Sequence, residues 1–210
     1  MTDEQPRTDG ADEAPDWAAY YRHTLGREAR PLFARGMGLV GAMGVESGQA
    51  IEVGFGDGTE TLALLADGWQ VLAIDPTLQA AEVLRSRVPP DLVARLEVRT
   101  TAAQDLVLPP FDLLYAGYAL SFVAPAAFPG WWAGMRAALR SGGYLVVNVF
   151  GDRDTWADDP SMTFVDRSTL LTMLDGLEIL DLAEEDADGP AFSGPKHWHV
   201  FDVVARRPAG

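Results

Sequence analysis

The segment Glu52-Val53-Gly54-Phe55-Gly56-Asp57-Gly58 decides the fold of this chain of 210 residues. It follows a short apolar run, residues 49–53, that predicts a buried strand, and it precedes residues 59–66, whose apolar spacing predicts a helix. Glycines at alternate positions let the backbone turn tightly and leave no Cβ in the way of a ligand. The free N–H groups that open the next helix favour an anionic group. The sequence therefore predicts a ligand-binding loop at the end of a first strand.

A second strand, residues 70–74, ends in Asp75, where a carboxylate can accept hydrogen bonds from both hydroxyls of a ribose. Helices expected over residues 78–88 and around Trp131–Leu139 alternate with strands expected at 96–99, 111–116 and 144–150. Ser141-Gly142-Gly143 is expected to cap the second of these helices. Strands that alternate with helices predict a parallel sheet covered on both faces.

The pattern changes after Gly151. A helix is expected over residues 167–174, and strands over 177–182 and 198–205. The connection between these strands, residues 183–197, has no helical run and predicts an antiparallel hairpin. We therefore expect an α/β, Rossmann-like fold with a seven-stranded, mostly parallel sheet, an antiparallel last strand and extra N-terminal helices.

The domain organisation follows from the same pattern. Residues 1–16 are acidic, contain Pro and Gly, and are expected to form a flexible tail. Residues 17–210 are expected to form one domain. It comprises N-terminal helices that act as a lid (17–47), a ligand-binding half (48–150), and a C-terminal helix with the hairpin (151–210).

The composition excludes several classes of function. The chain has no cysteine, so it has no disulfide scaffold, cysteine nucleophile or cysteine-ligated metal. Lys and Arg number 16 against 31 Asp and Glu, a net charge of −15 that disfavours nucleic acid and favours a cationic ligand. No signal peptide or membrane-spanning run is evident, and a cytoplasmic protein is expected.

The glycine spacing separates two kinds of nucleoside. The dinucleotide fingerprint G-x-G-x-x-G/A needs a small residue where Thr59 stands, and Glu52, two residues before Gly54, would repel a pyrophosphate but attract an ammonium. With these features the chain resembles class I S-adenosylmethionine-dependent methyltransferases. EVGFGDG resembles their motif I, AIDP their ribose-binding acid, FDLLYAGYAL their fourth-strand motif and LRSGGYLVV the helix-to-fifth-strand motif. The resemblance spans residues 45–207. Within the family, the closing GPKHWHVFDVVARR segment is most similar to small tellurite-resistance-like and thiopurine-like methyltransferases.

The resemblance implies a set of residues that bind S-adenosylmethionine. Glu52, Gly54, Gly56 and Gly58 would hold the methionine part, and Asp75 the ribose, with Pro76 and Thr77 beside the adenosine. Ala103 and Gln104 are expected near the adenine, although many relatives carry a polar residue where Ala102 stands, and Ala116 near the methyl group. Tyr21 and Arg30 would close over the site, with Arg30 pairing the carboxylate.

Methyl transfer is an in-line displacement that depends mainly on alignment. A small-molecule acceptor is expected, with a thiol, another chalcogen or a hydroxyl favoured. The Ala116-Gly117-Tyr118 segment lacks a carboxylate, so the reaction is expected to be metal-independent. His197, His199 and Tyr118 are the candidate catalytic residues; a zinc-binding pair and ordinary structural histidines are the alternatives for His197 and His199.

Two other functions compete with methyl transfer. One is an NAD(P)-dependent oxidoreductase, which the glycine spacing and Glu52 disfavour. The other is a non-catalytic S-adenosylmethionine-binding regulator, which the intact glycines and Asp75 disfavour.

Overall fold

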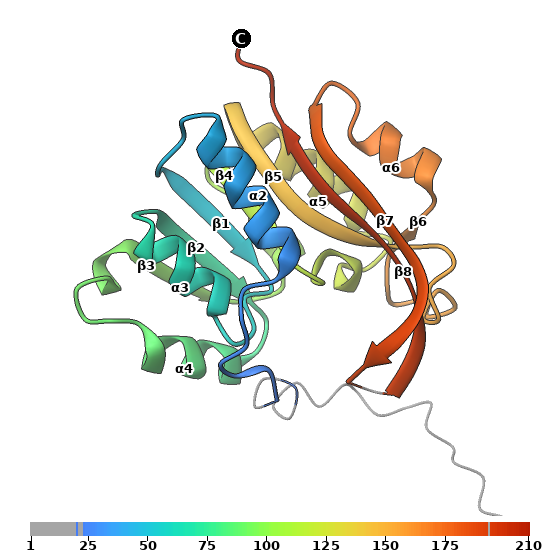
Figure 1. Cartoon of the computed structure of the whole chain (residues 1–210), viewed down its shortest axis with the longest axis horizontal. Coiled ribbons are helices and arrows are strands. Elements are labelled where there is room, and N and C mark those ends of the chain that lie inside the picture. Colours follow the sequence, from blue (N-terminus) through green and yellow to red (C-terminus); the bar gives the residue numbers. More distant parts are fainter. Residues whose placement is uncertain (1–19, 21–22, 193) are drawn as a thin grey trace, which may run out of the picture.

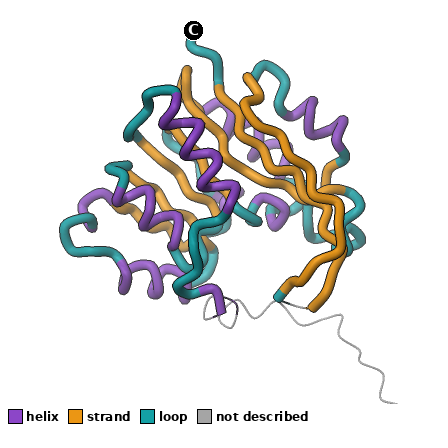
Figure 2. The backbone as a smooth tube through the Cα atoms, viewed as in Figure 1, coloured by secondary structure: helices purple, strands orange, loops and turns teal. Residues whose placement is uncertain are grey.

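One sheet runs through the part of the chain that the computed structural model describes, residues 20, 23–192 and 194–210 (Figures 1 and 2). Its strands are β1 Gln49–Val53, β2 Gln70–Asp75, β3 Leu96–Thr100, β4 Phe111–Ala116, β5 Leu139–Gly151, β6 Phe164–Val165, β7 Glu178–Ala191 and β8 Gly194–Arg206. Their order is β3-β2-β1-β4-β5-β8-β7, and the short β6 pairs with β5. Strands β1 to β6 pair in parallel, whereas β8 runs antiparallel to β5 and β7. This confirms the expected mostly parallel sheet with a reversed last strand.

Helices cover both faces of the sheet. They are α2 Pro31–Ala42, α3 Thr59–Ala66, α4 Leu78–Arg87, α5 Phe128–Ala138 and α6 Arg167–Met173, joined by the 3-10 turns η1 Val93–Arg95, η2 Ala103–Asp105 and η3 Leu120–Phe122. Alternate side chains of each strand pack on opposite faces. Tyr144 and Val146 join the core under α2, α3 and α4, whereas Leu145 and Val147 join the core under α5 and α6.

Local signals explain where the helices begin and end. Pro31 stands in the first turn of α2, where its missing N–H costs nothing. The Thr77 hydroxyl caps α4 by accepting from the Ala80 N–H, and α4 ends just before Val88 and Pro89. Asp166 caps α6 in the same way through the Thr169 N–H at 2.6 Å.

The C-terminal hairpin is longer than the sequence predicts. Residues 183–197 were expected to be an irregular connection, but β7 and β8 remain paired as far as Ala191 and Gly194. The alternation of apolar and polar residues that predicts a strand is missing here, because the side chains of residues 183–188 on the edge strand β7 are all exposed. Likewise, Ser141-Gly142-Gly143 lies within β5 and does not cap a helix, because α5 ends at Ala138.

The expected tail, residues 1–16, and nearly all of the expected first helix lie outside the described residues, as does Tyr21. Tyr20 and His23, which are described, contact the Phe192 ring at the end of β7, with centroid distances of 5.7 Å and 5.5 Å. The segment before α2 therefore lies beside the tip of the hairpin, as Figure 1 also shows. In the part of the chain that is described, no helix has both the length and the apolar character needed to cross a membrane.

Candidate cofactor and active site

The glycine loop joins β1 to α3 at the carboxyl end of the sheet, where the strand order reverses between β1 and β4. Gly54, Gly56 and Gly58 all adopt left-handed φ angles, of 72°, 53° and 77°. A Cβ at Gly54 would collide with the Cβ of Ala119, and one at Gly58 would press on Leu84. The three glycines are therefore required by backbone geometry and close packing, as the sequence predicts.

Three buried carboxylates surround this loop. Glu52, Asp57 and Glu60 are each at most 2% exposed, and among the described residues Arg27 is the one arginine that forms ion pairs within this group, with Asp57 and Glu60. Arg27 binds Glu60 through two bonds of 2.5 Å and reaches Asp57 at 3.2 Å. Burial, reinforced by the charge of Glu60, raises the pKa of Glu52 to about 8, and Glu52 also accepts a hydrogen bond from Thr61. Even with Glu52 protonated at neutral pH, the two acids Asp57 and Glu60 outnumber Arg27, which suits a cationic group.

Arg30 lies next to these acids and makes no ion pair with any carboxylate among the described residues. Its backbone N–H donates to Glu60, and its guanidinium donates to the Tyr20 hydroxyl at 3.1 Å and lies over the Tyr118 ring at 5.0 Å. A partly buried guanidinium without an acid partner suits an anionic group. An acid-rich loop beside an unpaired arginine therefore fits the ammonium and carboxylate of an amino-acid moiety.

Asp75 connects β2 to the glycine loop. Its carboxylate accepts from the Gly56 N–H at 3.1 Å and from the Thr77 N–H and hydroxyl at 2.9 Å and 2.8 Å. Pro76 beside it is exposed, and Thr77 is half-buried. The structure thus brings Asp75 and Thr77 to the glycine loop, as expected.

The remaining predicted cofactor positions lie at neighbouring strand ends. Ala116 is the buried last residue of β4. Ala103 and Gln104 lie in η2, after β3, and Ala103 is buried. Gln104 lines a hollow of about 230 Å³ beside Trp131 and Met135 of α5.

Tyr118, two residues after β4, starts an aromatic cluster that sequence analysis did not identify as a unit. Its ring contacts those of Phe150 and Trp198, with centroids 6.1 Å and 5.7 Å away, and Trp156 contacts both Phe150 and Trp198. Burial raises the pKa of the Tyr118 hydroxyl, so the phenol stays protonated at neutral pH and can donate but not accept a proton. The rings meet at interplanar angles of 51–74°, and together they form an apolar surface beyond the ends of β4 and β5.

Lys196, the only lysine in the chain, is held within this cluster. Its ammonium lies 3.4 Å from the Trp156 ring centroid and 3.9 Å from that of Trp198, and it pairs with Asp154 at 2.6 Å. Burial lowers the pKa of this amine, and the carboxylate opposes the shift. Lys196 and Asp154 thus fasten the loop after β5 to β8 under the aromatic surface.

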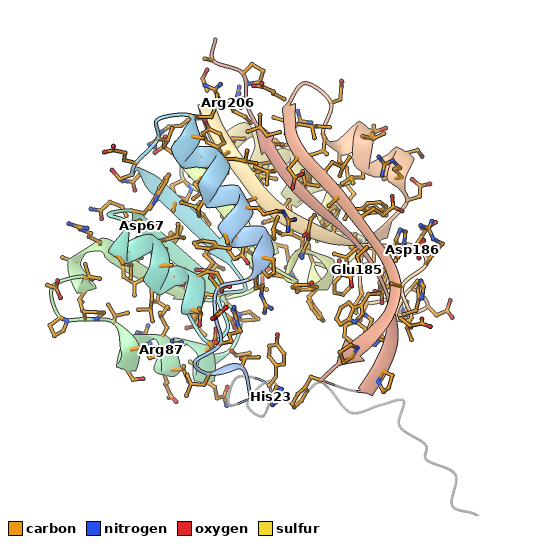
Figure 3. All side chains as sticks on the ribbon, viewed as in Figure 1. His23, Asp67, Arg87, Glu185, Asp186 and Arg206 are labelled. Carbon is orange, nitrogen blue, oxygen red and sulfur yellow. The ribbon has the colours of Figure 1, made fainter. Side chains whose placement is uncertain are left out.

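The two candidate histidines lie elsewhere. Lys196, Trp198 and Val200 belong to or border the aromatic cluster, so His197 and His199 point to the other face of β8. His197 pairs with Asp186 and Asp188, both at 2.8 Å, and the buried His199 packs on Phe201. Asp186, labelled in Figure 3, marks this outer side of the hairpin. The expectation that both histidines face the site is not met, because the pleat directs them away from Tyr118.

Glu184, Asp186 and His199 lie close enough together to suggest a metal site, with ligand atoms within 4.8 Å of one another. The Arg153 N–H donates to His199 Nδ1 at 3.0 Å, and His199 Nε2 lies 3.1 Å from Glu184 and 2.9 Å from the Arg153 guanidinium. The Arg153 guanidinium pairs with both carboxylates, at 2.8 Å and 2.7 Å. The trio is therefore an ion-pair network in which no imidazole lone pair is free.

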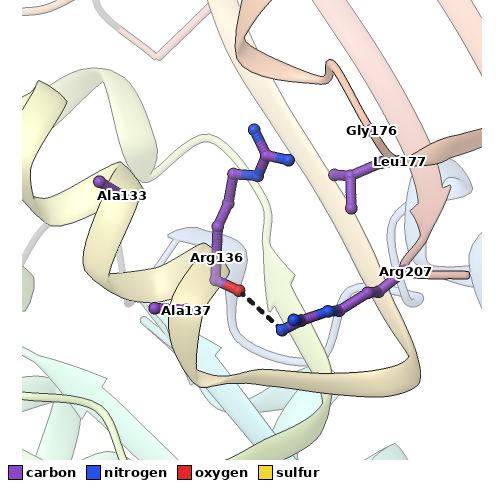
Figure 4. A pocket seen from close by; sticks show the side chains of 6 residues that line it. All are labelled: Ala133, Arg136, Ala137, Gly176, Leu177 and Arg207. Atoms are coloured by element: carbon purple, nitrogen blue, oxygen red, sulfur yellow. Dashed lines mark hydrogen bonds between the residues drawn. The ribbon is translucent and has the colours of Figure 1, made fainter. Parts of the chain in front are cut away.

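A larger hollow, of about 440 Å³, is lined by Arg136, Arg207, Leu177 and nearby small residues (Figure 4). It lies beside the start of β5, at the end of the sheet opposite the glycine loop. Arg136 donates to the carbonyls of Met173 and Asp175 and so caps the end of α6. These contacts give Arg136 a structural role.

Residues 51–145 match the family model described as a methyltransferase domain. A sequence search finds no match among curated proteins. TehB from Haemophilus influenzae superposes with a TM-score of 0.70 at 14% identity, over 91% of this chain and 67% of that chain.

Two further solved structures share the fold. The N-methyltransferase NodS from Bradyrhizobium japonicum WM9, in complex with S-adenosyl-L-homocysteine, has a TM-score of 0.66 at 16% identity over 92% of this chain and 100% of that one. The 1,6-didemethyltoxoflavin-N1-methyltransferase from Burkholderia thailandensis has a TM-score of 0.61 at 17% identity, over 96% and 93%.

A methyltransferase domain thus matches residues 51–145, and solved methyltransferase structures share the fold of the chain. These findings support a methyltransferase that uses S-adenosylmethionine, and the loop geometry and charges of the chain fit that molecule.

Proposed function

We propose that the chain methylates a small, partly apolar molecule, with a thiol, another chalcogen or a hydroxyl as the favoured acceptor and without a metal. The observation that carries this proposal is the aromatic surface of Tyr118, Phe150, Trp156 and Trp198 beyond the ends of β4 and β5. In open α/β sheets, ligands bind beyond the carboxyl ends of the strands, and aromatic side chains there favour apolar molecules.

The chain's own residues would form two binding regions, one for S-adenosylmethionine and one for the acceptor. Glu52 and the acids near it would hold the ammonium, Arg30 the carboxylate and Asp75 the ribose of S-adenosylmethionine. When bound, that molecule supplies an activated methyl group on a sulfonium. The acceptor would lie against the aromatic surface, where Tyr118 can donate a hydrogen bond and exclude water. The amine within the cluster, Lys196, is already paired with Asp154, so an acceptor that loses its proton readily is favoured.

Sulfur, oxygen and nitrogen acceptors can be tested in one set of assays. NodS and the toxoflavin enzyme are N-methyltransferases by name, so nitrogen acceptors belong in the same panel. The histidines face away from Tyr118, so neither of them is positioned to act as a base in the site.

The first experiment is a calorimetric titration with S-adenosylhomocysteine, with NADH as a parallel ligand. We expect micromolar binding of S-adenosylhomocysteine and no heat from NADH. Arg30→Met should weaken binding about tenfold, because one charged hydrogen-bonding partner is lost. Arg140→Met is the matched control, since Arg140 pairs with Asp112 on the surface near the start of β5. NADH binding without S-adenosylhomocysteine binding would instead support an oxidoreductase.

The second experiment measures methyl transfer from labelled S-adenosylmethionine to thiophenol, phenol and aniline. Faster transfer to the thiol or phenol, reduced by Trp198→Ala, would support the proposed acceptor class. Transfer to aniline alone would change the acceptor to nitrogen. Binding of S-adenosylhomocysteine without transfer to any small acceptor would favour a regulator.

A further inference from the structure

Tyr118 has an unusual backbone. Its φ of 58° makes it the one non-glycine residue with a left-handed φ among those that the structure describes. A residue with a side chain adopts this conformation only where its surroundings enforce it, and such residues gather at functional sites. Something must therefore hold Tyr118 in place.

Asn148 supplies that hold. It is a lone polar residue in the apolar run of β5, and it is 1% exposed. Its Oδ1 accepts the Tyr118 N–H at 2.6 Å, and its Nδ2 donates to Asp202 Oδ1 at 3.3 Å. Because both ends of the amide are used, its orientation is fixed.

The hydrogen bonds that fix Asn148 extend to the surface through β8. Asn148 and Asp202 are directly paired across β5 and β8. The second carboxylate oxygen of Asp202 accepts from Arg35 of α2 at 2.7 Å. Residues of α2, β8 and β5 thus form one chain of hydrogen bonds that ends at the Tyr118 N–H.

The held residue occupies a junction. The Tyr118 ring lies between the Arg30 guanidinium, 5.0 Å from its centroid, and the Trp198 ring, 5.7 Å away. Arg30 belongs to the side that fits S-adenosylmethionine, and Trp198 to the side proposed for the acceptor. A change in the Tyr118 backbone would move the ring between these two sides.

We propose that Asn148 is a positioning residue for methyl transfer: its amide holds Tyr118 in the left-handed conformation that places the ring between the two binding regions. The proposal rests on the proposed function for its two regions. Asn148 touches neither ligand and acts only through Tyr118. A leucine in its place would satisfy the apolar core but leave the Tyr118 N–H without a partner.

The test compares Asn148→Leu with Thr163→Val. Thr163 also makes a buried side-chain hydrogen bond, donated to the Val123 carbonyl at 2.7 Å, but it does not contact Tyr118. Hydrogen exchange of peptides spanning residues 114–122 should quicken in Asn148→Leu and not in Thr163→Val. The ratio of the dissociation constants for S-adenosylmethionine and S-adenosylhomocysteine, which differ by the transferred methyl, should change about tenfold in Asn148→Leu alone, from loss of one buried hydrogen bond next to the site.

A second background separates positioning from simple stability. Glycine adopts a φ near 58° without strain, so Tyr118→Gly removes both the strain and the ring. In that background Asn148→Leu should no longer change the ratio. An unchanged ratio in Asn148→Leu, or an equal change in the Tyr118→Gly background, would overturn the positioning role. A wild-type chain that binds neither ligand would overturn the proposed function, and with it any role of Asn148 in methyl transfer.

Discussion

Replacing Glu52 by glutamine should make the enzyme more stable at neutral and alkaline pH. Burial and the neighbouring Glu60 raise the pKa of Glu52 from 4.5 to about 8, so the folded protein keeps a proton that the unfolded chain has lost. The penalty for folding grows as the pH rises from about 4.5 to about 8 and is complete above that range. With 1.36 kcal/mol for each pKa unit, the loss between pH 5 and pH 8.5 is about 4 kcal/mol.

The sign follows from proton binding. Between these two pKa values the folded state binds more protons than the unfolded state, so the free energy of unfolding decreases as the pH rises. Glutamine has the shape of the glutamic acid and can still accept the hydrogen bond from Thr61, but it carries no charge at any pH. The pH-dependent part of the penalty should therefore disappear in Glu52→Gln.

The assay is urea denaturation at pH 5, 7 and 8.5 for the wild type, Glu52→Gln and Glu97→Gln. Glu97 is the control, because its side chain is 56% exposed on the edge strand β3. The difference in unfolding free energy between Glu52→Gln and the wild type should grow with pH and approach about 4 kcal/mol at pH 8.5. A difference that stays constant with pH, or one matched by Glu97→Gln, would refute the reasoning. The variant should also bind S-adenosylhomocysteine more weakly, because one of the buried carboxylates is gone.

Three further predictions concern the loop, the ribose acid and the histidines. Asp75→Ala should weaken S-adenosylhomocysteine binding by about 100-fold in calorimetry, through loss of charged hydrogen bonds, whereas Asp67→Ala, an exposed acid after α3, should leave it unchanged. Gly54→Ala should lower the free energy of unfolding by more than about 1–2 kcal/mol, since the left-handed φ is unfavourable for alanine and the new Cβ meets Ala119. The control Gly38→Ala should raise the free energy of unfolding slightly, because Gly38 lies within α2 and faces open space. His197→Ala should leave S-adenosylhomocysteine binding unchanged. Asp186 and Asp188 raise the pKa of His197, so the stabilisation from this pairing is fully present below about pH 6.5 and is lost as the pH rises through the pKa of the folded state. The melting temperatures of the variant and the wild type should therefore differ more at pH 6 than at pH 9.

The part of the site that sequence predicts well is the part made by local backbone chemistry. Helix α3 and strand β4 occur at the expected bounds, because Gly58 and Asp67-Gly68 limit one and Pro109-Pro110 precedes the other. The three glycines and Asp75 could be placed because each is defined by a strand end. The long hairpin was missed because an exposed edge strand needs no apolar alternation.

Other parts of the site depend on contacts between distant segments. Arg27 and Glu60 are 33 residues apart in sequence, and Lys196 and Asp154 are 42 residues apart, so no local sequence pattern predicts either pair. Asn148 was also missed, although it left a signal. One amide within the otherwise apolar run Tyr144–Phe150 must find partners when buried, and that requirement indicates a role beyond packing.

The register between β5 and β8 decides which chemistry reaches the site. Phe150 is paired with Val200 and Asn148 with Asp202, which places Lys196 and Trp198 on the face that Tyr118 occupies. A shift of one residue would exchange these side chains for His197 and His199, because neighbouring residues of a strand point to opposite faces. The bond between Asn148 and Asp202 opposes that shift, since either buried group would lose its partner. The same amide that holds Tyr118 therefore helps to keep an aromatic surface, and not a pair of bases, next to the proposed acceptor, which in turn favours an acceptor that needs alignment more than deprotonation.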